Sequence, residues 1–564
     1  MAAPAQGVPT GPTPPIVACL RCREQKLKCG RELPTCERCR KKDAACTYPP
    51  PPDRKRIAAE KNRSKASQAN NSSHTHEHGS SFSKTHATKK RRLSYSNTVP
   101  FDCLAEPDVA DLPSTEIGLL LQEVYFKHIY HAHLMFHKTV TFQVYMLKKM
   151  PDHLQRAIFA HGALFLQEVD PQYQKYVKAY PMQTLYERSW SWAHAASVQV
   201  LSHVDEPSVP KIQTLLVLQQ FYWARGEIVR AKIHATLAYR LSQLLGYDEL
   251  YENGDPALVN PSLKFDREIR RRSYWASWGT MCLHSEEIVQ RYNRARGLPL
   301  PAEFGPGGSI QGVELIHGQK MTRTWKVDSD SELNNGETST LTAEMMKLLG
   351  IWGNTRALVL TFKNRPTLEG IEEFDQVDES LDEIEPSVQF LVQDIFAKAK
   401  SYDESPEFLV CVCSVFYLSR AFVDVFKAVN PDPDTRTLGA TPASQLSTGK
   451  RAIEESLRFI QLLQQLLETG QDITRLWHVA GYAAFIAAQI LAHADRDIYS
   501  EGLKTCRTII EVLSTYWKPL KSLAANLKAT MEAARYPNVV LPLFYLLDYV
   551  NFFCDGELAS DVGN

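Results

Sequence analysis

The sequence lacks the features that mark a secreted or membrane-spanning protein. Its first residues, MAAPAQGVPTGPTPP, do not contain the basic and then apolar segments of a secretory signal. The best candidate for a membrane span, VAGYAAFIAAQILA at 479–492, has 14 residues and includes Gln489. Because a bilayer needs about 20 apolar residues, we interpret this segment as a buried helix and expect no membrane partner.

Sequence motifs of the common enzyme classes are also missing. The chain contains no P-loop, no G-x-G-x-x-G after a strand, no G-x-S-x-G and no H-E-x-x-H. Four histidines gather in one segment, but helical spacing would place them on different faces; they are His128, His131, His133 and His137. We therefore predict no catalytic residue and no enzyme.

Cysteine is scarce outside one short stretch. Six of the twelve cysteines lie between residues 19 and 46, in CLRCREQKLKCGRELPTCERCRKKDAAC. The other six are scattered through the chain, at Cys103, Cys282, Cys411, Cys413, Cys506 and Cys554. Isolated cysteines of this kind are typical of reduced core thiols in an intracellular protein.

The cysteine-rich stretch contains an internal duplication. Its spacing is C-x2-C-x6-C-x6-C-x2-C-x6-C, so that each cysteine of the first half recurs 17 residues later. Two arginines of the first half, Arg21 and Arg23, recur at the same offset as Arg38 and Arg40. The pattern predicts two similar loop–helix units that face a shared centre.

The number of thiols predicts how that centre is built. A stretch this short cannot bury enough apolar surface to fold without a staple, and C-x2-C pairs without a secretory context favour zinc over disulfides. Two tetrahedral zinc ions need eight metal–sulfur bonds, and six thiolates supply eight if two of them bridge. The duplication points to Cys19 and Cys36 as the bridges, and the full predicted ligand set is Cys19, Cys22, Cys29, Cys36, Cys39 and Cys46.

These six cysteines resemble the DNA-binding module of the fungal zinc-cluster (Zn2Cys6) transcription factors in both number and spacing. Pro34, in the loop between the two halves, also fits the pattern of that family. The resemblance covers a small part of the chain, and it implies two bound Zn2+ ions and double-stranded DNA as a partner.

Charge distinguishes the two halves of the module. When CREQKLKC is aligned with CRKKDAAC, Lys26 corresponds to Asp43, and Lys28 corresponds to Ala45. The first half is therefore the better candidate for the major groove, where a lysine can donate to guanine O6 and N7. The family resemblance implies that Lys26 approaches a CGG-type triplet, whereas we expect Arg23 and Lys28 to contact phosphates.

The chain has no net charge, but its charge is unevenly distributed. Residues 1–100 carry 20 Lys or Arg and 7 Asp or Glu, a balance of +13 that the rest of the chain offsets. Such a basic head suggests nucleic acid as a partner. Residues 53–100 are poor in large apolar side chains, which predicts disorder. The basic run Lys89, Lys90, Arg91 and Arg92 is a candidate nuclear import signal.

Helical periodicity dominates from about residue 113 onward, and β-rich runs are rare. We predict a mostly α protein with loops near 328–340 and 430–447. The expected domains are a disordered tail (1–17), the zinc module (18–50), a disordered basic linker (51–112), an all-α regulatory domain (113–555) and a short tail (556–564). Segments within 115–310, including LLVLQQFYWARGE, resemble the "middle homology" domain that accompanies zinc clusters in fungal factors.

Two segments of the helical domain each allow two interpretations. EIRRRSYW (268–275) combines arginines with aromatic rings, but we interpret it as a core helix whose arginines pair with carboxylates such as Asp266 and Glu268. TLEGIEEFDQVDESLDEIEP (367–386) has nine acidic residues and no Lys or Arg. It is either an acidic activation segment or an amphipathic helix with a solvated face.

Taken together, these patterns predict a nuclear, sequence-specific regulator of RNA polymerase II transcription. A pathway-specific activator is the first expectation, and a repressor or chromatin-complex subunit is the alternative. A zinc-containing enzyme would require an open metal position, which the cysteine count does not leave. The linker has no leucine or isoleucine heptad, so the sequence leaves open monomeric binding, homodimerisation through the body, and contacts with transcription machinery or a small effector.

Overall fold

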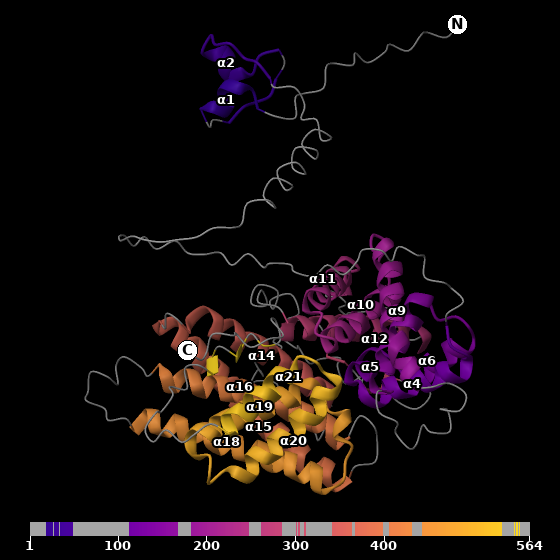
Figure 1. Ribbon diagram of the computed structural model, residues 1–564, viewed down its shortest axis with the longest axis vertical. Coiled ribbons are helices and arrows are strands. Elements are labelled where there is room, and N and C mark those ends of the chain that lie inside the picture. The colour runs from indigo at the N-terminus through magenta and orange to yellow at the C-terminus, as the bar shows by residue number, and fades with distance from the viewer. Residues whose placement is uncertain are drawn as a thin grey trace, which may run out of the picture. The chain divides into compact units, whose positions relative to one another are not determined.

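The chain divides into two units, Met1–Pro100 and Phe101–Asn564 (Figure 1). The structure is a computed structural model. It describes residues 18–25, 28–32, 34–48, 112–166, 182–247, 261–284, 300–301, 303–304, 310–311, 341–363, 367–398, 405–430, 443–532, 546–547, 549–550 and 552. Lys26, the import-signal candidate at 89–92, the loop at 328–340 and nearly all of the predicted linker lie outside these residues.

The first unit contains two short helices that repeat the sequence duplication. Helix α1 spans Leu20–Glu24 and helix α2 spans Glu37–Lys41. Cys19 is the N-cap of α1, with φ −59° and ψ 152°, and Cys36 is the N-cap of α2, with φ −65° and ψ 147°. In both helices the N-cap carbonyl accepts a 3.0 Å hydrogen bond from the residue four positions later. The two halves therefore have the same local backbone conformation.

The described parts of the second unit are mostly helices joined by turns, with one antiparallel pair of two-residue strands, β1 (Glu303–Phe304) and β2 (Ile310–Gln311). This confirms the mostly α prediction. Its helices are α4 (Thr115–His128), α5 (Tyr130–Met135), α6 (Lys138–Met146), α7 (Asp152–Ala163), η2 (Leu164–Leu166), α9 (Met182–Ser202), α10 (Val209–Ala224), α11 (Ile228–Leu244), α12 (Pro261–His284), α14 (Leu341–Phe362), α15 (Leu368–Lys398), α16 (Pro406–Val429), α18 (Ala443–Glu468), η9 (Ile473–Arg475), α19 (His478–Asp495), α20 (Ser500–Tyr516) and α21 (Leu520–Glu532).

Local sequence signals explain where several of these helices begin. Ser114 caps α4 by accepting a hydrogen bond from the backbone N–H of Ile117. Ser405 caps α16 in the same way, and Pro406 occupies the first turn, where its missing N–H costs nothing. Helix α18 begins at Ala443, inside the predicted loop at 430–447. That part of the loop prediction was wrong, because Ser444 and Ser447 are tolerated in a helix.

Among the described helices, one, α16, is long and apolar enough to cross a membrane by length and composition, but the whole of its apolar window is buried inside the unit. Helices α14, α15, α18 and α19 pack around it. The segment at 479–492 lies in α19 and is likewise buried, as predicted. Both helices therefore form the centre of the core of the second unit.

Two groups of helices meet within this unit. Helices α4–α12 lie on one side and α14–α21 on the other in Figure 1. Helix α12 packs against α14, and His128 Nδ1 lies 3.3 Å from the carbonyl oxygen of Thr474. Arg475 Nε donates to the carbonyl oxygen of Lys127 at 3.3 Å. The resemblance of residues 115–310 to a middle-homology domain stays a prediction.

Candidate metal centre

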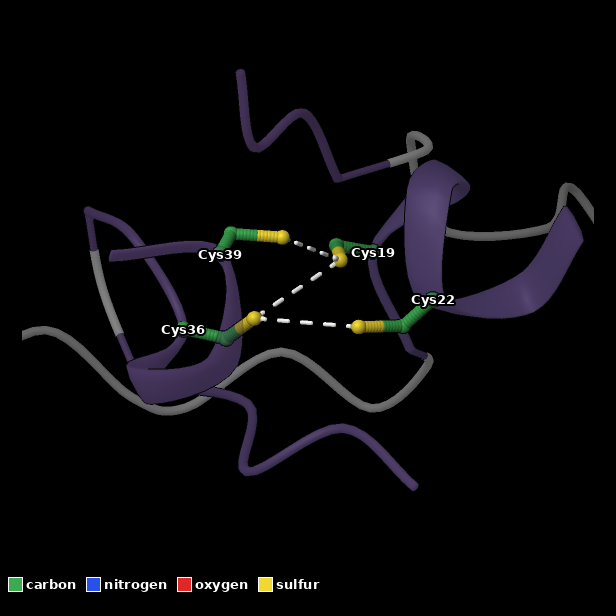
Figure 2. A group of neighbouring side chains, drawn as sticks. All are labelled: Cys19, Cys22, Cys36 and Cys39. Atoms are coloured by element: carbon green, nitrogen blue, oxygen red, sulfur yellow. Dashed lines mark hydrogen bonds between the residues drawn. The ribbon is translucent and has the colours of Figure 1, made fainter. Parts of the chain in front are cut away.

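Four cysteine thiols from the two halves of the first unit lie together in a buried group (Figure 2). The Sγ atoms of Cys19, Cys22, Cys36 and Cys39 all lie within 4.8 Å of one another. Three pairs are closest: Cys19 to Cys36 at 3.9 Å, Cys19 to Cys39 at 3.8 Å, and Cys22 to Cys36 at 3.9 Å. It is the single candidate metal group among the described residues.

These distances fit thiolates that share a tetrahedral metal ion. A Zn–S bond of about 2.3 Å and a tetrahedral angle place two sulfur atoms on one zinc about 3.8 Å apart. The Sγ atom of Cys19 lies at that distance from a thiol of the second half, Cys39, and the Sγ atom of Cys36 lies at that distance from a thiol of the first half, Cys22. The thiols of Cys19 and Cys36 therefore each lie close enough to a thiol of the other half to share a metal ion with it.

The remaining two cysteines complete the group from its edge. Cys29 and Cys46 are half-buried and pack against the four inner thiols, as does the ring of Tyr48. The backbone N–H of Cys36 donates to the Cys46 Sγ atom at 3.4 Å. All ten described cysteines of the chain are free, so the structure does not contain the disulfide framework that six cysteines could have formed.

The chemistry of the thiols also fits a metal. Burial raises the pKa of the Cys39 thiol to about 12, and burial also raises the pKa of Cys19. Six thiolates so close together would repel one another without a cation among them. A bound divalent ion with a preference for sulfur displaces the thiol protons, and its positive charge offsets the repulsion between the thiolates.

Most of the described cations of the module are exposed. In the second half, Lys41 Nζ lies 2.8 Å from Glu37 Oε1, and this contact lowers the pKa of the Glu37 carboxyl. In the first half, Arg23 and Lys28 are exposed and pair with no carboxylate among the residues that the structure describes. In the second half, Arg38 and Lys42 are likewise exposed and pair with no described carboxylate, so ion pairing does not distinguish the two halves. The preference for the first half rests on the contrast between Lys26 and Asp43 in the sequence.

The arginine-rich segment of α12 is part of the core, as interpreted from the sequence. Tyr274 and Trp275 are buried. Glu268 holds both buried arginines, Arg271 at 3.1 Å and Arg272 at 2.8 Å. In addition, Arg270 pairs with Asp266 at 2.5 Å on the exposed side. Arg272 also donates to the carbonyl oxygens of His133 and Leu134 and so joins α12 to α5.

The histidine segment holds no metal group among the described residues. His133 Nε2 lies 2.7 Å from the carbonyl oxygen of Phe126, and His137 Nδ1 accepts from the backbone N–H of Val140. The sequence did not reveal that His131 is buried in the same region of the core as three histidines distant in the chain. Those three are His161, His284 and His478.

Comparison with known proteins matches the module to one family. Residues 17–55 match the model of the fungal Zn(2)-Cys(6) binuclear cluster domain. The first unit therefore contains a zinc-cluster module that binds two zinc ions, as the cysteine count predicted. The sequence is also similar to Protein STB5 of Saccharomyces cerevisiae, with 46% identity over 44 residues. That match covers 8% of this chain and 6% of the yeast protein. No solved structure matches this chain.

Proposed function

We propose that this protein is a nuclear, sequence-specific DNA-binding regulator of RNA polymerase II transcription. The observation that carries the proposal is the zinc-cluster module, in which six thiols gather around a buried centre and the exposed cations Arg23 and Lys28 have no described carboxylate partner. A small metal-held scaffold with uncompensated positive charge suits contact with a phosphate backbone.

We assign the six thiols to two zinc ions that share two bridging ligands. One ion takes Cys22 and Cys29, the other takes Cys39 and Cys46, and Cys19 and Cys36 bind both. The cross-half distances of 3.8 Å and 3.9 Å support this assignment. Every coordination position is then filled by sulfur, so the ions act as a structural staple and not as a Lewis acid for catalysis.

In this proposal the first half of the module reads the bases. Lys26 donates to guanine in a CGG-type triplet, while Arg23 and Lys28 bind phosphates on either side. Asp43, at the position equivalent to Lys26, is exposed and has φ 44°. A carboxylate there would repel the DNA backbone, which supports the assignment of readout to the first half.

The helical unit has the regulatory role, with activation as the leading candidate. The acidic segment forms the first part of α15, and its apolar residues Phe374, Val377, Leu381 and Ile384 are buried. Carboxylates of this helix pair with basic residues of α16 and α18. This packing favours the amphipathic-helix interpretation, so we place any activation surface elsewhere; a repressor or chromatin-complex subunit is the alternative.

Fluorescence anisotropy with the full-length protein tests DNA recognition. The protein should bind a labelled duplex with a CGG triplet at least about 1,000-fold more tightly than a scrambled duplex at the same salt concentration. Equal affinities would overturn the proposal of sequence-specific binding. A fusion of residues 101–564 to an unrelated DNA-binding domain, upstream of a reporter gene, then separates an activator from a repressor.

A further inference from the structure

A solvent-open pocket lies on the helical unit, where the end of α10 meets α9 and the turn between α20 and α21. Its volume of about 530 Å3 falls within the range of roughly 300–1,000 Å3 that is usual for small-molecule sites. We propose that this pocket binds a small organic anion that carries a planar aromatic ring. The proposal does not depend on DNA binding.

The first observation is an excess of positive charge. Arg225, Lys518 and Lys521 line the pocket, together with a single carboxylate, Glu227. Glu227 lies 3.9 Å from Arg230, whereas the three lining cations pair with no carboxylate among the described residues of the unit. Like charges gathered in a partly enclosed site repel one another, and a bound anion relieves that repulsion.

The second observation is that the arginine is held in place. Arg225 Nη1 donates to the Tyr186 hydroxyl at 2.6 Å. Its guanidinium also lies 5.4 Å from the centre of the Tyr186 ring and 5.9 Å from that of Trp190. A guanidinium fixed by aromatic rings loses little freedom when it binds a carboxylate, and its remaining N–H groups suit a bidentate contact.

The third observation is the glycine turn beside the pocket. Gly226 has φ +77°, and a Cβ atom placed there would lie 3.2 Å from Lys518 Cδ. The backbone N–H of Lys518 donates to the carbonyl oxygen of Ala224 at 2.8 Å. The methylene groups of Lys518 therefore pack over Gly226, in the space that a side chain at that position would occupy. This contact holds Lys518 at the edge of the pocket, next to Arg225.

Aromatic side chains supply the apolar part of the site. Tyr186, Trp190 and Tyr516 line the pocket and are only partly buried. Tyr516 stacks on Phe165, with ring centres 4.9 Å apart and planes 20° from parallel, so its position is fixed. Rings at the wall of a cationic pocket suit a ligand with a flat apolar body and one anionic end.

Isothermal titration calorimetry of the full-length protein tests this proposal with two matched probes, naphthalene-1-carboxylate and neutral 1-naphthalenemethanol. The carboxylate should bind with one-to-one stoichiometry, and the alcohol should bind at least about tenfold more weakly, since it lacks the charge-assisted hydrogen bonds. No binding of the carboxylate below about 1 mM, or equal binding of the alcohol, would overturn the proposal.

Charge-reversal variants on one helix locate the site. Lys521→Glu should weaken binding of naphthalene-1-carboxylate by about 10- to 100-fold. Lys528→Glu is the matched control, because Lys528 is an exposed residue two turns further along α21 and does not line the pocket. Far-UV circular dichroism verifies that both variants are folded. An equal loss in the two variants would show a long-range charge effect and would refute the site.

Discussion

The Sγ atoms of Cys19 and Cys36 lie 3.9 Å apart, and each of these cysteines caps the short helix of its own half of the module. Their φ and ψ values are nearly the same, so the duplication places two equivalent thiols face to face. A pair of thiols at equivalent positions around a shared centre is the arrangement that two bridging ligands require.

Zinc content should respond differently to the loss of a bridging and of a terminal thiol. Cys36→Ala removes one ligand from both ions, so the purified variant should retain less than one zinc per chain. Cys46→Ala removes a ligand from one ion only and should retain about one. Inductively coupled plasma mass spectrometry after gel filtration measures both. Cys506→Ala, in a buried thiol of α20, is the control and should keep two.

Removal of zinc should unfold the module and leave the helical unit intact. Four buried cysteines make up the centre of the module, whereas the second unit has an extensive apolar core of its own. We expect EDTA to abolish specific DNA binding while most of the far-UV circular dichroism at 222 nm remains, because α1 and α2 have only five residues each. A collapse of the helical signal after EDTA treatment would contradict this independence.

Two lysines of the first half should have separable effects on DNA binding. Lys26→Ala should cost about 1–3 kcal/mol on a CGG-containing duplex and little on scrambled DNA. Lys28→Ala should weaken both and reduce the slope of log K against log salt by about 0.9. Lys42→Ala, an exposed lysine of the second half, serves as the comparison. The assignment fails if Lys26→Ala and Lys28→Ala lose the same affinity on both duplexes.

The zinc centre could be predicted from the sequence because its ligands are close together in the chain. Six cysteines within 28 residues lead to two metal ions with two bridging ligands by arithmetic, and the duplication suggests Cys19 and Cys36 as the bridges. The buried pairing of Arg271 and Arg272 with Glu268 could be anticipated for the same reason, since an i,i+3 or i,i+4 spacing on a helix brings these groups together.

Contacts between distant segments could not be predicted in this way. The acidic face of α15 looked either solvated or suited to activation, but Arg420, 35–42 residues further along the chain, contacts three of its carboxylates. Periodicity locates the apolar face of a helix, but it does not reveal which residue of another helix pairs with the charged side chains beside that face. The cationic pocket depends in the same way on Arg225 and Lys518, which are far apart in the sequence.

Arg420 should therefore be important for stability. It is buried on α16 and contacts Asp378, Asp382 and Glu385 of α15, with the Asp382 contact at 2.6 Å. Arg420→Met should lower the free energy of unfolding by about 3 kcal/mol, since carboxylates lose their central cation while the side-chain volume is kept. Arg458→Met removes an arginine that is 61% exposed and should cost less than about 1 kcal/mol. Urea denaturation followed by circular dichroism compares the two.

Buried histidines should make the helical unit sensitive to mild acid. Burial lowers the pKa of His131 to about 3 and that of His161 to about 3, and neither ring nitrogen of His161 has a hydrogen-bond partner. In the unfolded chain these groups titrate near pH 6.5. Below that pH the unfolded state binds protons that the folded state does not, so stability falls as the pH drops from about 6.5 toward 3.

The magnitude of this acid effect follows from the size of the pKa shift. At pH 5 each such histidine should cost about 2 kcal/mol relative to neutral pH. The urea midpoint should therefore fall between pH 7 and pH 5, and His161→Phe should reduce that fall because the ring is replaced by one that cannot bind a proton. His203→Gln, at an exposed position, should leave the fall unchanged. If His161→Phe loses as much stability between the two pH values as the unsubstituted protein does, protonation of His161 in the unfolded state is not a source of the acid sensitivity.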